Sequence, residues 1–439
     1  MSKITLGIIG GGQLGSMLAI AAKKLNIKTV IFCDDSDAPA QNFCDNFISG
    51  KYDDKNKISE FTNQVNVVTY EFENIPYETL NEINKLKPVL PKPSVNRLIQ
   101  HRLAEKDFVN KLNIRTTRYV SIEKKSDIDA LEDFLPGILK TTTLGYDGKG
   151  QHPISSSEEL SSINLDFSKG YILEKLVKLK KEISIVITRF SNNKYEIYEP
   201  IENTHEDQIL KYSKIPADID EKIFNQSKEW SMLIAEELKY IGTLCVEFFI
   251  DRNDNLYVNE IAPRVHNSGH LTINAFNVSQ FENHVRAVCE LEQIPLKKIS
   301  NAKMINLIGS QIKPYRENYK LNDNEIIQKV EKMSFKIFLE IISHQNHFEM
   351  NEHWRPMIYQ LLGFPIKKIN LYTLSRLDYL KNDLEKFLSK ELIFETQIKR
   401  GGHSTSSGRD LEEYYSEDVL NIFNRIYKKD ILLYESLVN

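Results

Sequence analysis

The sequence has few cysteines, no long apolar run and no excess of either charge. Its cysteines lie far apart, and none belongs to a Cys-x-x-Cys pair; they are Cys33, Cys44, Cys245 and Cys289. This spacing argues against a disulfide framework and a structural zinc site, and favours reduced thiols in a cytoplasmic protein. No apolar stretch approaches the roughly 20 residues of a membrane span. We therefore expect neither a membrane segment nor a cleaved leader.

The charge balance is nearly even, with 57 Lys and Arg against 61 Asp and Glu, giving a formal net charge of −4. Such a balance offers no basic footprint for duplex nucleic acid or for an anionic membrane, so local sites must bind any phosphate. The chain length of 439 residues corresponds to about three domains. Hydrophobic residues at 41% and charged residues at 27% are typical of a globular protein.

The start of the chain predicts a parallel α/β sheet. Residues 4–9 read as a strand, a glycine turn and a helical pattern follow to Leu25, and residues 28–32 read as a second strand. This βαβ order is typical of a Rossmann-like domain. We place that domain at residues 1–95.

The residue pattern of the remaining chain changes twice. Residues 96–310 carry short β-rich runs and turns after a helix that we expect from Ser94 through Val109, which predicts an α+β domain with mostly antiparallel strands. Residues 311–439 carry long helical patterns rich in Lys, Glu, Asn and Leu, which predict a mainly helical segment.

The glycine turn has the spacing Gly10-x-Gly12-x-x-Gly15, with Asp34 or Asp35 about 20 residues further on. Taken alone, this fingerprint favours a nicotinamide-dependent dehydrogenase. Two other interpretations stay open: the glycines only allow a tight turn to pack, or the turn binds one phosphorylated substrate at the helix N-terminus.

A second glycine-rich segment contains Gly145, Gly148 and Gly150 and is flanked by Lys140 and Lys149. Glycines let backbone N–H groups approach phosphates, while the lysine ammonium groups neutralise charge. The segment is either an ATP phosphate lid or a plain hairpin turn with solvated lysines.

Two β-rich runs, residues 244–250 and 256–261, flank a turn-rich linker and predict a hairpin. If the loop is symmetric about Asn253–Asp254, Glu247 lies directly opposite Glu260. Facing carboxylates about 5 Å apart repel unless a cation or a proton lies between them. Magnesium held together with substrate phosphates is the natural cation. The alternative is a pair of solvated glutamates.

Polar side chains are dense just after this hairpin, where Arg264, His266, Asn267, Ser268 and His270 occur within seven residues. A guanidinium, two imidazoles, an amide and a hydroxyl form a set of donors for an anionic, hydroxylated substrate.

Together these motifs resemble the 5-(carboxyamino)imidazole ribonucleotide synthase family, ATP-grasp enzymes of purine biosynthesis. The resemblance covers about residues 1–310 and includes Gly-Gly-Gly-Gln-Leu-Gly near the start, Thr-Tyr-Glu-Phe-Glu-Asn at 69–74 and Met-Ile-Asn-Leu-Ile-Gly at 304–309. It implies a Rossmann-like pre-ATP-grasp domain at 1–95 and an ATP-grasp fold at 96–310. It also reassigns the glycine fingerprint from a dinucleotide to the ribonucleotide substrate.

The resemblance implies roles for individual residues. ATP would contact cations, a phosphate lid, an adenine hinge, a ribose-binding glutamate and their neighbours, namely Arg102, Lys140, Gly145, Tyr146, Asp147, Gly148, Lys149, Gly150, Gln151, Glu174, Lys175, Leu176, Val177, Glu182, His205, Asn259 and Glu260. Glu247 and Glu260 would hold Mg²⁺. The substrate shell would be Gln13, Tyr146, Arg264, His266, Asn267, Ser268 and His270, and the catalytic residues Lys140, Arg264 and His266.

The implied reaction is carboxylation of 5-aminoimidazole ribonucleotide by bicarbonate, which ATP first converts to carboxyphosphate. A different-substrate or impaired ATP-grasp ligase is the alternative, and a nicotinamide-dependent oxidoreductase is a more distant one. The resemblance is compatible with a homodimer.

The family's usual small C-terminal domain is not recognisable here. Segments beyond residue 330 instead resemble the last third of a carbohydrate sulfotransferase, without the donor-binding loop of that family; they are 334–338, 353–356, 376–380, 413–415 and 426–430. We therefore expect a structural appendage and no second activity. The basic stretch 399–403 fits that sulfotransferase-like ending better than a ribonucleotide phosphate site.

Overall fold

The computed structural model describes residues 4–143, 151–206 and 208–307, nearly all of which lie in the first of two compact units, Met1–Asn306. These residues form three sheets, and none of their helices is long and apolar enough to cross a membrane. The predictions for 311–439, including the sulfotransferase-like segments, lie outside the described residues.

The N-terminal sheet is parallel, as its βαβ pattern predicts, with strand order β3-β2-β1-β4. Leu6 and Ile8 of β1 enter one core and Ile9 enters another, since helices cover both faces of the sheet. The elements in chain order are β1 (Thr5–Ile9), α1 (Gln13–Lys24), β2 (Lys28–Cys33), the 3₁₀ helix η1 (Pro39–Asn42), β3 (Asn46–Ser49), α2 (Lys55–Thr62), β4 (Val67–Tyr70) and α3 (Tyr77–Leu86).

The single helix predicted from Ser94 through Val109 is wrong. The chain forms two helices, α4 (Pro93–Ile99) and α5 (Arg102–Lys111). The break occurs because the ring of His101 accepts the Ala104 N–H as a cap, while the Arg102 N–H donates at 2.9 Å to the carbonyl of Thr142. The second helix thereby starts at Arg102.

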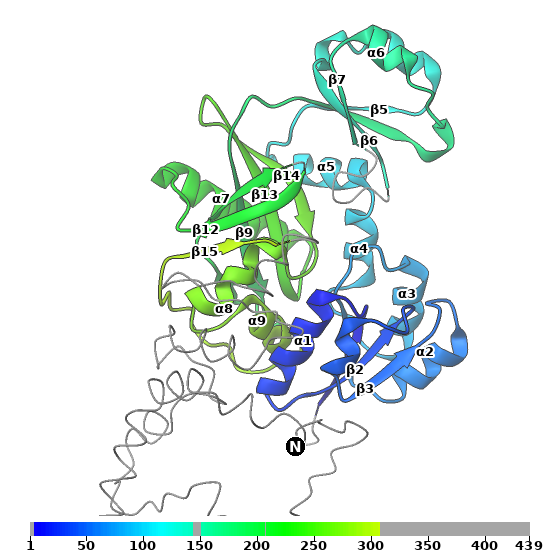
Figure 1. Cartoon of the computed structure of the whole chain (residues 1–439), viewed down its shortest axis with the longest axis vertical. Coiled ribbons are helices and arrows are strands. Elements are labelled where there is room, and N and C mark those ends of the chain that lie inside the picture. The colour runs from blue at the N-terminus through cyan, green and yellow to red at the C-terminus, as the bar shows by residue number, and fades with distance from the viewer. Residues whose placement is uncertain (1–3, 144–150, 207, 308–439) are drawn as a thin grey trace, which may run out of the picture. The chain divides into compact units, whose positions relative to one another are not determined.

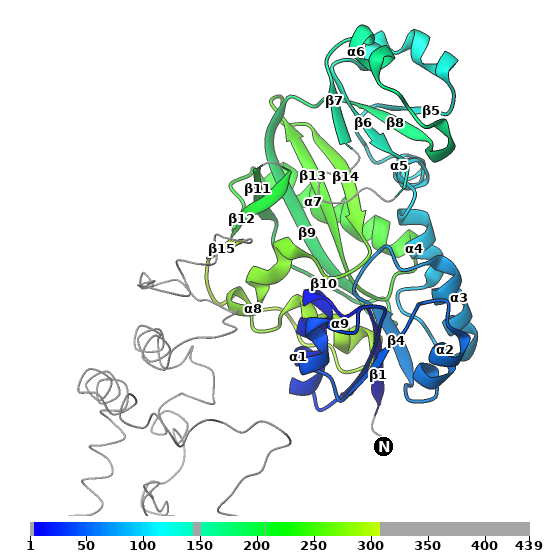
Figure 2. The same ribbon diagram turned by 45° about the vertical axis from the view of Figure 1, so that its right-hand side comes forward.

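Two sheets follow, and their strands are antiparallel, as the pattern of residues 96–310 predicts. The smaller has the order β5-β8-β6-β7 and contains β5 (Tyr119–Ile122), β6 (Gly137–Thr141), β7 (Gln151–Ile154) and β8 (Tyr171–Lys175), with η2 (Lys125–Ala130), η3 (Glu132–Phe134), α6 (Ser157–Ser162) and η4 (Phe167–Lys169) around it. In Figures 1 and 2 it lies at the far end of the larger sheet from the parallel sheet.

The larger sheet has the order β14-β13-β9-β11-β12-β15, and β10 also pairs with β9. Its strands are β9 (Leu179–Arg189), β10 (Tyr195–Ile197), β11 (Ile201–Glu206), β12 (Ile209–Ile215), β13 (Gly242–Asp251), β14 (Leu256–Ala262) and β15 (Ala302–Ile305). Its helices are α7 (Glu221–Glu237), η5 (Asn267–Leu271), α8 (Thr272–Ala275) and α9 (Gln280–Val288).

One buried histidine joins the parallel sheet to the larger sheet. His284 of α9 lies 2.8 Å through Nε2 from the Thr69 hydroxyl on β4, and its Nδ1 accepts the Thr243 N–H of β13 at 3.0 Å. Burial lowers the pKa of His284 to about 4, so the ring is neutral near pH 7. This contact connects the strand before Glu71 and Glu73 to the strand that carries Glu247.

Candidate active site

The two glutamates of the hairpin face each other, as the sequence predicts. Glu247 of β13 pairs with Glu260 of β14. The expected loop centre was wrong, however, because Ile250 pairs with Leu256 and the loop is centred one half-residue earlier. A bulge at Asn259 restores the predicted register, so the two carboxylates still come opposite each other.

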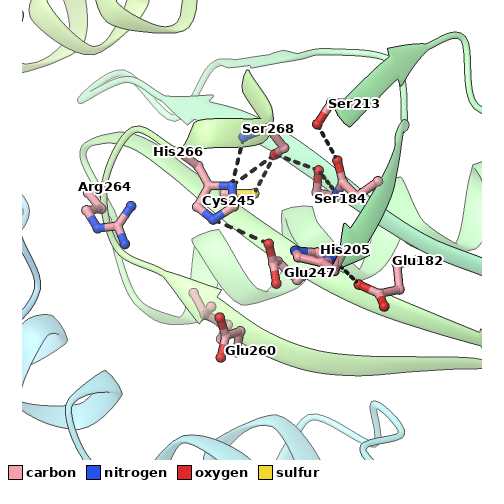
Figure 3. Close-up of polar contacts among 12 residues, drawn as sticks. Glu182, Ser184, His205, Ser213, Cys245, Glu247, Glu260, Arg264, His266 and Ser268 are labelled. Carbon is pink, nitrogen blue, oxygen red and sulfur yellow. Dashed lines mark hydrogen bonds and ion pairs between the residues drawn. The ribbon is translucent and has the colours of Figure 1, made fainter. Parts of the chain in front are cut away.

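The environment of this carboxylate pair disfavours two negative charges. Burial raises the pKa of Glu247 to about 8, and the charge of Glu260 adds to the rise, while nearby His205 opposes it. His266 Nε2 lies 3.3 Å from Glu247 Oε1 (Figure 3). Glu260 is more exposed, and its Oε2 lies 3.7 Å from Arg102 Nη1. A cation placed between the carboxylates would relieve their repulsion.

Helix α5 contributes two further charged residues that the sequence interpretation missed. Glu105 is buried and accepts the Ile261 N–H at 2.6 Å; burial and then the charge of Glu260 raise its pKa to about 8. Lys106 is buried and reaches the Asn259 carbonyl at 3.4 Å. Their positions three and four residues after Arg102 place all three on one helix face, which was the available sequence signal.

The predicted nucleotide cation Lys140 lies in a buried ion cluster. Its Nζ is 3.1 Å from Glu174 Oε1, and Lys106 Nζ is 3.4 Å from Glu174 Oε2. Burial alone would raise the pKa of Glu174, but Lys106 and Lys140 lower it to about 2. Burial also lowers the pKa of Lys140, against the pull of Glu174. Two ammonium groups are thus held side by side by one carboxylate.

The predicted adenine hinge, residues 174–177, begins in the last two residues of β8. The Glu174 side chain points into the ion cluster, and the Leu176 N–H donates to the Pro136 carbonyl at 2.9 Å. On the larger sheet, Glu182 Oε2 lies 2.6 Å from His205 Nδ1 (Figure 3). Burial would lower the pKa of His205, but the bond to Glu182 raises it.

Arg264 is held by a residue of the parallel sheet's domain. Its Nη2 lies 2.9 Å from Glu73 Oε1, and its Nε also contacts the same carboxylate, which makes the pair bidentate. Burial would raise the pKa of Glu73, but Arg264 lowers it. The sequence interpretation missed Glu73, although its motif contributed to the resemblance.

One amide side chain fixes the backbone around the two histidines. The Gln280 Oε1 accepts the His266 N–H at 2.9 Å, and its Nε2 donates to the His266 carbonyl at 2.6 Å and to His270 Nδ1 at 3.3 Å. Burial and then Arg264 lower the pKa of both rings, that of His270 to about 4. Both rings are therefore neutral at pH 7.

The glycine turn is occupied by a side chain of the same protein. Glu71 accepts the N–H groups of Gly12 at 2.6 Å and Gly15 at 2.7 Å. Gly10 has φ +98°, and a Cβ there would lie 2.6 Å from Glu71 Cγ, so only glycine fits. A phosphate at these two amides would have to displace the Glu71 carboxylate.

The remaining predicted residues are scattered. Gln13 is exposed in the first turn of α1, Asn267 is exposed at the start of η5, and Ser268 is fully buried. Gln151 begins β7 and pairs with Lys140. Gly145, Tyr146, Asp147, Gly148, Lys149 and Gly150 lie outside the described residues. Among the described residues, no hydrogen bond or ion pair joins Gln13 to Glu247 or Glu260. By contrast, these two carboxylates interact electrostatically with five of the predicted residues, namely Arg102, Lys140, His205, Arg264 and His266.

Comparison with known proteins decides the family. The ribonucleotide synthetase preATP-grasp domain matches residues 1–100 and the ATP-grasp domain matches residues 107–281. The N5-carboxyaminoimidazole ribonucleotide synthase of Staphylococcus aureus (strain COL) is 38% identical over 313 residues, covering 70% of this chain and 83% of that protein. The chain belongs to the N5-carboxyaminoimidazole ribonucleotide synthase family. This name and 5-(carboxyamino)imidazole ribonucleotide synthase denote the same family, so the resemblance seen in the motifs is confirmed.

Solved structures of N5-carboxyaminoimidazole ribonucleotide synthases agree. The Staphylococcus aureus enzyme complexed with ADP is 37% identical with a TM-score of 0.67, covering 71% of this chain and 84% of that one. The Aspergillus clavatus enzyme with ADP and 5-aminoimidazole ribonucleotide is 26% identical with a TM-score of 0.65, covering 70% and 83%. The chain is therefore an ATP-grasp ligase of purine biosynthesis that binds ATP, and the nicotinamide interpretation of the fingerprint is wrong.

Proposed function

We propose that the chain uses ATP to carboxylate 5-aminoimidazole ribonucleotide with bicarbonate, through carboxyphosphate, and forms N5-carboxyaminoimidazole ribonucleotide, ADP and phosphate. The observation that carries the proposal is the 3.3 Å contact of His266 with Glu247. This contact places the polar side chains after β14 next to the carboxylate pair. Carboxyphosphate formed at the carboxylates would therefore lie beside the side chains that bind the ribonucleotide.

The nucleotide phosphates fit the cationic side of this wall. Lys140 and Lys106 flank Glu174, and Arg102 approaches Glu260. These fixed cations would neutralise charge on the transferring phosphoryl group without reorganising during the reaction. We assign adenine to the hinge 174–177, the ribose to Glu182 with His205 near it, and the phosphate lid to 145–151.

The donor set fits Mg²⁺. Magnesium prefers one or two carboxylates plus substrate phosphates to a full cage of protein ligands. Among the residues that the structure describes, no group of three or more His, Cys, Asp or Glu side chains could hold a metal ion. Glu247 and Glu260 supply two hard oxygen ligands, and a cation beside them would offset the burial and the repulsion that raise the pKa of Glu247. When bound there, Mg²⁺ would add positive charge beside the phosphoryl group.

The chemistry has two steps. Transfer of the γ-phosphoryl group to a bicarbonate oxygen breaks the bond to ADP and gives carboxyphosphate. The exocyclic amine of the ribonucleotide then attacks the carbonyl carbon, phosphate leaves with the C–O bonding electrons, and the amine loses a proton. Arg264, Asn267 and His270 would orient the anionic groups, His266 would stay beside them at Glu247, and exclusion of water would protect carboxyphosphate from hydrolysis.

The cysteines bear on where the enzyme works. All four are free thiols in the structure, which supports a cytoplasmic enzyme.

The resemblance also allows a homodimer. Light scattering of the full chain tests this oligomeric state.

Carbon-13 bicarbonate tests the reaction directly. The full chain, ATP, Mg²⁺, 5-aminoimidazole ribonucleotide and labelled bicarbonate should give ADP together with a labelled carbamate signal on the ribonucleotide. Omitting the ribonucleotide should remove that signal. ADP release with another amine acceptor, but none of this carbamate, would instead favour a ligase with a different substrate. Absence of ADP release would favour an impaired one.

A further inference from the structure

A line of buried polar side chains leads from β12 to the imidazole of His266 (Figure 3). The hydroxyl of Ser213 is 2.8 Å from Asn203 Oδ1, and Asn203 Nδ2 is 3.0 Å from the Ser184 hydroxyl. The Ser184 hydroxyl is 2.8 Å from that of Ser268, which is 2.9 Å from His266 Nδ1. All three serines are fully buried and Asn203 is nearly so.

The direction of these hydrogen bonds follows from one backbone group. The Ser268 N–H donates to His266 Nδ1 at 3.3 Å, and a backbone N–H can only donate. His266 Nδ1 therefore carries a lone pair, and the Ser268 hydroxyl must also donate to it. Since that hydroxyl has one hydrogen, it accepts from Ser184, which in turn accepts from the Asn203 NH₂ group. The Asn203 oxygen then faces Ser213, which donates.

The same reasoning fixes the other ring nitrogen. A neutral imidazole with a lone pair on Nδ1 carries its hydrogen on Nε2. His266 Nε2 faces Glu247 Oε1 at 3.3 Å, so the ring presents a donor to that carboxylate. A nitrogen that carries hydrogen cannot ligate a metal ion through a lone pair.

We propose that Ser213, Asn203 and Ser184 are positioning residues, which act through Ser268 to hold His266 with its hydrogen on Nε2, aimed at Glu247. We call these four residues the polar relay. The relay orients the Glu247 carboxylate and keeps His266 from binding metal itself. Its role in turnover rests on the proposed function, because Glu247 matters there as a ligand beside the phosphoryl group.

Nuclear magnetic resonance of the full chain with ¹⁵N-labelled histidine tests the tautomer without any substrate. The couplings from ring carbon-bound hydrogens to the two nitrogens show which nitrogen carries hydrogen, and His266→Gln identifies the His266 signals by their loss. We expect one neutral species with hydrogen on Nε2. Hydrogen on Nδ1 in the unmodified chain would overturn the proposal, whatever the enzyme's activity.

Three serine-to-alanine variants test the relay. Ser184→Ala should introduce a population with hydrogen on Nδ1, and Ser213→Ala a smaller one. Ser231→Ala is the matched control, since Ser231 is also fully buried but its hydroxyl donates within α7, to the carbonyl of Ser227. A Ser184→Ala or Ser213→Ala spectrum identical to that of Ser231→Ala would overturn the relay as a connected unit.

Kinetics separate positioning from a general loss of stability. Ser184→Ala should lower kcat roughly 3- to 10-fold, the scale of one hydrogen bond, while KM for ATP stays within about twofold. Ser231→Ala should leave both unchanged. Equal loss in the two variants would show a structural effect only. If the unmodified chain fails to carboxylate the ribonucleotide, the proposed function fails, while the tautomer result still decides the relay.

Discussion

Two buried glutamates, Glu71 and Glu247, show how the same side chain can serve structure in one region and chemistry in another. Burial raises the pKa of both. Glu71 meets two backbone N–H groups, of Gly12 and Gly15, which lower its pKa in opposition to burial. Glu247 faces a second carboxylate, Glu260, which raises its pKa further. The first carboxylate is therefore satisfied within the chain, whereas the repulsion at the second must be relieved by a proton or a cation.

The comparison reverses the apparent strength of the two sequence signals. The glycine turn matches a well-known fingerprint, yet its amide donors are engaged by Glu71. The hairpin matches no short motif, yet it brings two acidic side chains, an arginine and an imidazole together. Asking which hydrogen-bond donors and acceptors are already paired within the chain thus locates the reactive site better than the motif does.

Removing charge from the hairpin should have the largest effect. We expect Glu260→Gln to lower magnesium-dependent ATP turnover at least about 100-fold, because an amide replaces a hard anionic ligand beside the phosphoryl group. ADP release at saturating Mg²⁺ measures the loss, and circular dichroism checks the fold. Glu229→Gln changes an exposed glutamate of α7 and serves as the control. Near-normal turnover in Glu260→Gln would refute the metal assignment.

Arg264 tests whether the residues after the hairpin bind the ribonucleotide and not ATP. Arg264→Ala should raise KM for 5-aminoimidazole ribonucleotide roughly 10- to 100-fold and KM for ATP much less, since one charge-assisted contact is lost away from adenine. The control is Arg286→Ala, which removes an arginine paired with Glu282 on α9. We expect His270→Ala to act in the same direction. Equal weakening of both substrates would contradict this division.

A substitution of Glu71 tests whether its carboxylate stabilises the fold. Glu71→Gln should lower the free energy of unfolding by about 2–3 kcal/mol, because the amide cannot accept both N–H groups as a carboxylate does. The midpoint of urea unfolding measures this change. Glu78→Gln, at an exposed glutamate in the first turn of α3, should have little effect. If the Glu71→Gln chain is as stable as the Glu78→Gln chain, the Glu71 carboxylate does not stabilise the glycine turn, and the prediction is wrong.

His284 connects the two regions and should give the smallest effect. Its pKa of about 4 in the folded state lies below the unfolded value of about 6.5, so the unfolded chain binds the proton first. The contribution is fully present above pH 6.5 and is lost as the pH falls towards 4. Between pH 6.5 and 5.5 it should cost about 1 kcal/mol of stability. His284→Gln should remove that part of the pH dependence; an unchanged slope would contradict it.

The hairpin shows how far local patterns reach. Alternating apolar runs around turn residues predicted that Glu247 would oppose Glu260, and the structure confirms it. The bulge at Asn259 was missed, because a bulge depends on contacts outside the hairpin; Lys106 binds the Asn259 carbonyl. The helix break before Arg102 was missed for the same reason, since the Arg102 N–H donates to the carbonyl of Thr142, which follows β6.

The sequence by itself determined the opening strand-helix-strand order, the facing carboxylates and the family, because periodicity, turn residues and motif order are properties of neighbouring residues. Only the tertiary structure decided which charges pair. Glu71 meets Gly12 across 59 positions and Arg264 meets Glu73 across 191. The polar relay joins four separate elements. Such pairings form because packing buries these groups together, and a buried polar group must then find whichever partner the fold brings within reach.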